Sequence, residues 1–173
     1  MTGIMFQSSV GTYRHALSVL DSILRKGQAR AVEAGFPPEN LLGARLAPDM
    51  HSLLRQVQIA CDLAKSGGAR LAGVDIPSHP DGETTFEQLF LRIGKVQEFL
   101  ETLDAEAIEQ GANRTIELTV RDQKFSFGGV DFLNRWSLPN FYFHLGMVYA
   151  LLRHNGVALG KRDFLFPQDG RMA

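Results

Sequence analysis

Residues 139–157 read PNFYFHLGMVYALLRHNGV and carry the clearest architectural signal in the chain. Pro139 suits the first turn of a helix and disfavours its interior, and Gly156 is a residue type that commonly ends one. One side of the intervening stretch is apolar at helical spacing. The stretch therefore predicts a long helix near the end of the chain, preceded by a short helical segment around residues 130–136.

Three upstream stretches repeat apolar residues at steps of three and four, the spacing of amphipathic helices packed in a bundle. The predicted helices span about 6–27, 48–67 and 85–103. Seven positions on the four apolar stripes are expected to be buried: Leu17, Leu20, Val57, Ile93, Val96, Val148 and Leu152. The fold class predicted is all-α, a four-helix bundle.

The segments between the helices have their own signals. Residues 71–83 contain two glycines and two prolines, which predicts a long loop with some functional potential. Thr84 or Thr85 can cap the third helix, because Glu87 and Gln88 lie three residues on, as in a capping box. Residues 115–120 and 125–127 alternate with period two, which indicates a small β-hairpin inserted before the last helix. Residues 157–173 are expected to pack as a coil.

Composition bounds the class of protein. A chain of 173 residues with 45% apolar and 21% charged residues suits one packed domain over residues 1–173. With 18 basic and 19 acidic residues, the net charge of -1 does not favour a nucleic-acid partner. Residues 1–10 carry no basic residue before their apolar positions and no apolar run is long enough to span a membrane, so we expect a cytoplasmic protein that does not interact with membranes. The single Cys61 projects onto an apolar stripe and is expected in the core.

Familiar catalytic and nucleotide-binding motifs are missing. The sequence has no P-loop, no dinucleotide-binding glycine pattern, no G-x-S-x-G elbow and no H-E-x-x-H zinc helix. The aromatic run 141–143 is expected to serve packing. Five histidines remain as candidates: His15, His51, His79, His144 and His154.

His144 is the candidate whose position is most informative. It shares its helix face with Met147, Val148 and Leu151, so it should point inward and need a hydrogen-bond partner on the second helix or the hairpin. His144 and His154 are ten residues apart, about 15 Å along a helix, which is too far to share one metal ion.

The other histidines are weaker candidates. His15 and His51 project toward solvent; the expected neighbours of His51 on that exposed face are Arg55, Gln58, Asp62 and Lys65. His79 belongs to the 71–83 loop, where a histidine is more often solvated, although it can fold over one end of the bundle as a ligand.

Residues 140–157 resemble the final helix of DinB-like proteins, which typically read H-x-x-x-H, then a glycine two residues later, then A-L-L-R-x-x-G. The order of helices and the long connection match as well, and the hairpin insertion resembles an uncharacterised branch of the DinB/YfiT-like superfamily. The resemblance implies a site for a divalent metal, often zinc or nickel, held by one histidine from the second helix and two from the last. Some members are thiol-dependent transferases or isomerases.

The metal-site positions implied by the resemblance are only partly kept in this chain. His144 matches the second histidine of the final-helix pair, Asn140 stands where the first would be, and Gln56 stands on the second helix in place of a histidine. Amide oxygens are weaker zinc ligands than imidazole, so the expectation is a degenerate site. His51 can substitute only if the second helix is rotated.

Three hypotheses follow. The first is a DinB-like protein of unknown function with a degenerate metal site and a small-molecule pocket around His144. The second is a metal-dependent hydrolase or thiol transferase that uses His144. The third is a homodimeric interaction module without catalysis, since homodimers are common among soluble proteins.

Overall fold

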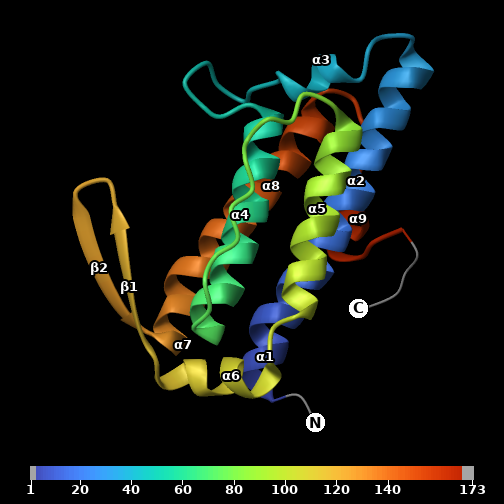
Figure 1. The fold of residues 1–173 in the computed structure, drawn as a ribbon. Helices are drawn as coiled ribbons and strands as arrows, with labels where there is room; N and C mark the ends of the chain where they lie inside the picture. The colour runs from blue at the N-terminus through green and yellow to red at the C-terminus, as the bar shows by residue number, and fades with distance from the viewer. Residues whose placement is uncertain (1–2, 169–173) are drawn as a thin grey trace.

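Four long helices run side by side in the computed structural model, which describes residues 3–168 (Figure 1). They are α2 (Thr12–Ala34), α4 (Leu53–Ala72), α5 (Phe86–Glu101) and α8 (Leu138–His154). Helix α4 packs against α5 and α8, and so does α2, so that α2 and α4 lie across a diagonal of the bundle. The predicted all-α four-helix bundle is confirmed, and all seven stripe residues named above are buried.

The first helix is longer at both ends than its stripe predicted. It begins as α1 (Ile4–Phe6), passes through a π turn, η1 (Gln7–Gly11), and continues as α2 to Ala34. The expected end near Gly27 is wrong, because Ala31 one turn later is still buried in the core. The helix ends where Gly35 adopts a left-handed conformation with φ 77°.

The second helix begins later and ends later than predicted. Pro48 lies outside it, and Ser52 caps α4 by accepting a hydrogen bond from the backbone N–H of Arg55. Gly67 does not end it. A Cβ at Gly67 would lie 2.5 Å from the hydroxyl of Tyr13, so the glycine lets α2 approach α4 closely. Tertiary packing therefore outweighs the low helix propensity of this position.

The start of the third helix is as predicted. Thr85 caps α5 by accepting from the backbone N–H of Gln88, whose side-chain Oε1 in turn accepts from the N–H groups of Thr84 and Thr85. This is a capping box, and it leaves both N–H groups satisfied at the point where the loop enters the bundle.

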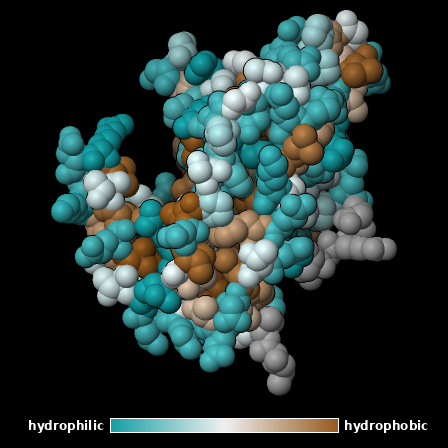
Figure 2. All heavy atoms as spheres, in the orientation of Figure 1, coloured by the Kyte–Doolittle hydropathy of each residue, from teal (hydrophilic) through white to brown (hydrophobic). Residues whose placement is uncertain are grey.

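The predicted β-hairpin is confirmed and is slightly longer. Strand β1 (Thr115–Val120) pairs antiparallel with β2 (Gln123–Gly128), joined by the turn residues Arg121 and Asp122. The hairpin stands beside one end of the bundle (Figure 1). Phe125 packs on Trp136 with ring centroids 5.2 Å apart. Figure 2 shows apolar side chains gathered low on the same face, next to the hairpin, while the upper part is mostly polar.

The last helix is one continuous element rather than two. Helix α7 (Gly129–Asp131) leads into a π turn, η3 (Phe132–Ser137), and then into α8. Pro139 lacks a backbone N–H, and the π turn directly before it lets the helix continue past this position.

Short helices complete the chain. They are α3 (Glu39–Leu42), α6 (Ala105–Gln110), the 3₁₀ turn η2 (Gly111–Asn113) and α9 (Lys161–Leu165). The expectation of a coil after residue 157 is wrong for α9, which packs against α2 through an ion pair of 2.6 Å between Lys26 and Asp163. Residues 169–173 of that prediction lie outside the described part. Within residues 3–168, no helix combines the length and apolar character needed to cross a membrane.

Candidate functional site

His144 and Gln56 face each other between α8 and α4. The Nδ1 atom of His144 lies 2.6 Å from Oε1 of Gln56, whose side chain is buried. His144 itself is half-buried, and the ring of Phe143 meets it edge to face at 5.2 Å. The prediction that His144 bonds a polar group on the second helix is confirmed.

The partner atoms define the protonation of the imidazole. Gln56 offers an oxygen, which can only accept, so Nδ1 of His144 carries the proton and donates. The amide nitrogen of Gln56 donates in turn to the backbone oxygen of His51, at 3.4 Å. The lone pair of His144 is therefore on Nε2, the nitrogen that Gln56 does not contact.

Burial keeps this imidazole neutral. Desolvation lowers the pKa of His144 to about 4, and the nearby positive charges of His51 and Arg55 act in the same direction. At neutral pH the side chain is consequently an uncharged hydrogen-bond acceptor at Nε2.

The other predicted site residues lie differently. Asn140 is half-buried one turn before His144, and its side-chain nitrogen donates to the backbone oxygen of Trp136 at 2.7 Å. His51 is exposed just ahead of α4. The structure thus brings Gln56 and His144 into contact, whereas no hydrogen bond joins Asn140 to either of them.

These donors fit a tightly bound zinc or nickel ion poorly. The side-chain oxygen of Gln56, its only good metal ligand, is taken by His144 Nδ1. Across residues 3–168 there is no group of three His, Cys, Asp or Glu side chains arranged to hold a metal ion. The imidazole of His144 can still offer Nε2 to a metal ion, because Gln56 engages only Nδ1.

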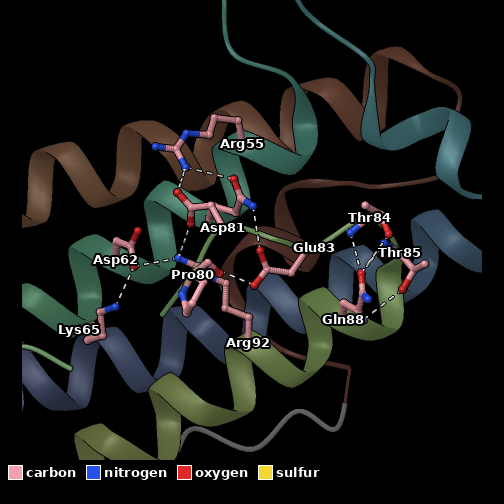
Figure 3. Close-up of polar contacts among 11 residues, drawn as sticks. Arg55, Asp62, Lys65, Pro80, Asp81, Glu83, Thr84, Thr85, Gln88 and Arg92 are labelled. Atoms are coloured by element: carbon pink, nitrogen blue, oxygen red, sulfur yellow. Dashed lines mark hydrogen bonds and ion pairs between the residues drawn. The ribbon is translucent and has the colours of Figure 1, made fainter. Parts of the chain in front are cut away.

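A second polar cluster joins α4, α5 and the long loop (Figure 3). Arg92 of α5 is only 2% exposed, and its guanidinium reaches Asp62 of α4 at 2.9 Å and Glu83 and Asp81 of the loop at 3.0 Å each. It also donates to the backbone oxygen of Pro80 at 3.2 Å. One buried cation therefore attaches the loop to two helices.

Neighbouring side chains complete this cluster. Arg55 pairs with Asp81, Lys65 lies 3.0 Å from Asp62, and Gln58 donates to Glu83 at 2.8 Å. Gln58 and Lys65 were expected to face solvent, but they are 2% and 4% exposed. The expectation was wrong because helical projection cannot anticipate that a loop folds back over that face of α4.

Ion pairing controls the two loop acids. Burial alone would raise the pKa of Glu83, but hydrogen bonds from Arg92 and Gln58 outweigh it and hold that pKa below its usual value. Burial likewise opposes ionisation of Asp81, and hydrogen bonding to Arg55 again brings the pKa below the ordinary value. Both carboxylates are charged at neutral pH.

A sequence signal for Arg92 existed. It follows Leu89 by three residues and precedes Val96 by four, so helical periodicity places a charged residue on the buried stripe. A buried guanidinium needs acidic partners. The expectation of packed aromatics at 141–143 also needs correction: Phe141 is fully buried, but Tyr142 and Phe143 are 38% and 54% exposed.

Comparison with known proteins supports the architecture. A family model described as Domain of unknown function (DUF1993) matches residues 5–165. The crystal structure of a DinB family member protein from Shewanella denitrificans superposes with a TM-score of 0.89 at 38% identity, covering 95% of this chain and 93% of that one. No curated protein matches the chain.

Proposed function

Because the chain belongs to the DUF1993 family of domains of unknown function and has the DinB-like fold, we propose that it binds a small polar molecule at His144 and does not depend on a tightly bound metal ion. The observation that carries this proposal is the 2.6 Å contact between His144 Nδ1 and Gln56 Oε1. It fixes the imidazole in one tautomer and leaves Nε2 as the acceptor.

The chemistry of such a site follows from the neutral ring. Nε2 accepts a hydrogen bond from a hydroxyl, amide or thiol of the ligand, and can receive a proton from a group that becomes acidic when bound. Gln56 has the positioning role, since it orients the ring without touching the ligand. Asn140 lies one turn earlier on α8, and its side-chain nitrogen is engaged by the backbone oxygen of Trp136.

The second candidate, a metal-dependent hydrolase or thiol transferase, is favoured by the same contact. Metal-binding imidazoles usually donate their other N–H to an oxygen of the protein, as His144 does to Gln56. A metal site at His144 would need further ligands. In this chain they would have to come from Asn140, His51 or the reactant itself.

Thermal unfolding with zinc or nickel separates the two candidates. The parent protein is compared with His144→Ala and with His154→Ala, a control that removes an exposed histidine from the end of the same helix. We expect neither metal to raise the melting temperature of any of the three proteins. A rise in the parent and in His154→Ala that is absent in His144→Ala would favour the metal-dependent enzyme.

The tautomer has its own test. Long-range proton–nitrogen NMR should show Nδ1 of His144 protonated and Nε2 unprotonated at neutral pH. Gln56→Leu should abolish this preference while the spectrum stays that of a folded protein. An Nε2-protonated ring in the parent would remove the acceptor on which the proposal depends.

Self-association is a third property that we propose, on the basis of fold class alone. Light scattering during size-exclusion chromatography measures it directly. A monomer at every concentration tested would remove the homodimer from consideration without affecting the proposal for His144.

A further inference from the structure

A pocket of about 300 Å³ lies between the long loop and α5, apart from the His144 site. It is lined by loop residues 78–80 and 82–83 and, on α5, by Gln88, Leu91, Arg92 and Lys95. This volume is at the lower end of the range for small-molecule sites in proteins. The pocket therefore admits a small organic molecule.

The charges around this pocket leave one cation unbalanced. Behind the pocket, three cations face three carboxylates: Arg55, Lys65 and Arg92 against Asp62, Asp81 and Glu83. Lys95, in contrast, is exposed at the rim and forms no ion pair within residues 3–168. The net charge that a ligand meets there is positive.

The polar atoms at the pocket are mainly donors. The imidazole of His79 lines the pocket and can donate a hydrogen bond through a protonated ring nitrogen. Gln88 has its oxygen engaged by the capping box, which leaves its amide N–H groups. Glu83 is the one carboxylate of the lining, and its oxygens are occupied by Arg92 and Gln58.

The remaining lining is apolar. Leu91 is 66% exposed on the outer face of α5, and Pro80 lies opposite it in the loop. Burying this leucine against a hydrocarbon group is favourable. A positive, donor-rich pocket with an apolar wall suits an amphiphilic anion.

We propose that this pocket binds a small organic carboxylate, with the carboxylate at Lys95 and His79 and the hydrocarbon part against Leu91. Lys95 and His79 both line the pocket, so a carboxylate within it can lie against the two side chains. A bound anion also compensates the charge of Lys95.

The state of His79 provides a second readout. Burial lowers the pKa of His79, and the charges of Lys65, Arg92 and Lys95 lower it further, while Asp62 opposes them. A carboxylate bound beside the ring favours the imidazolium form, so binding should raise the pKa of His79. A neutral ligand of the same shape should leave it unchanged.

The experiment titrates the full chain with butyrate and with butyramide, its neutral counterpart, while NMR follows the amides of residues 78–95 and the His79 ring. We expect saturable shifts with butyrate, weak or no shifts with butyramide, and a higher pKa of His79 at saturation. Lys95→Met should weaken butyrate binding by up to about fivefold, since an exposed ion pair contributes up to about 1 kcal/mol.

Two further variants make the outcome decisive. Lys124→Met removes an exposed lysine from the hairpin and should leave binding unchanged. Leu91→Gln should weaken the binding of butyrate more than the binding of acetate. Butyrate has a longer hydrocarbon chain, so it loses more apolar contact when the leucine is removed. Equal binding of butyrate and butyramide, unchanged binding in Lys95→Met, tighter binding of inorganic phosphate than of butyrate, or no saturable shifts would each overturn the proposal.

Discussion

The guanidinium of Arg92 lies 2.9 Å from the carboxylate of Asp62, on a neighbouring helix, and the same group reaches Glu83 in the loop that covers both helices. One buried charge therefore links α4, the loop and α5. Buried ion pairs contribute little net stability compared with apolar packing, but removing one partner is costly because it leaves the other charges uncompensated.

Arg92→Met should therefore destabilise the protein by about 2–4 kcal/mol, toward the lower end of the range for broken buried pairs, because Asp62 and Asp81 are about 40% exposed and can be hydrated. Urea unfolding measures the loss. The control is Arg14→Met, which breaks an exposed pair with Glu101 and should cost less than about 1 kcal/mol. Equal losses in the two variants would show that Arg92 does not hold the loop.

Stability should fall with acidification in a window set by His144. Its pKa is about 4 in the folded protein and 6.5 for the free side chain, so the unfolded chain binds the extra proton first. The contribution of His144 to the free energy of unfolding is fully present above pH 6.5 and is lost as the pH falls from 6.5 to 4. The expected loss over this window is about 1–3 kcal/mol. The loop acids Asp81 and Glu83 act at lower pH, because their folded pKa values lie below the ordinary ones.

Urea unfolding of the parent and of His144→Gln at pH 4.5 and 7 isolates this contribution. The variant should lose less stability between the two pH values than the parent does. An identical loss in both proteins would mean that another group titrates in this window.

A charge at the centre of the bundle should prevent folding. Val57 is completely buried on α4 and Ile93 is 1% exposed on α5, so aspartate at either position would place a carboxylate among apolar side chains without a partner. We expect Val57→Asp and Ile93→Asp to accumulate as insoluble protein. Val32→Asp, at a position 66% exposed on α2, should remain soluble. Normal solubility of both core variants would contradict the helix phasing.

The base of the hairpin depends on a close backbone contact. A Cβ at Gly129 would lie 1.8 Å from the backbone oxygen of Gly111, which allows no side chain without moving the chain. We expect Gly129→Ala to lower the melting temperature by several degrees. Gly146→Ala, on α8, would meet nothing within 4 Å and should be neutral or stabilising by up to about 1 kcal/mol. A harmless Gly129→Ala would mean that the hairpin can shift at little cost.

Local sequence patterns determined the type of most elements. The four stripes, the capping box at Thr85 and the period-two hairpin each depend on neighbours a few residues apart, so the bundle was predictable without coordinates. The inward position of His144 followed from the same periodicity. The predicted helix ends at Gly27 and Gly67 and the predicted helix start at Pro48 were wrong. Glycine and proline often mark helix boundaries, but packing against other parts of the chain outweighs this local preference.

The site required the tertiary structure. Periodicity indicated that His144 needs a partner, but only the packing of α4 against α8 identified Gln56 Oε1 as that partner and so fixed which ring nitrogen is free. The cluster around Arg92 joins residues 62, 81 and 83 through a loop with no periodic pattern. Sequence alone determined the helices and their buried faces, because these depend on local spacing. The tertiary structure decided the polar contacts, because such contacts depend on distances between residues far apart in the chain.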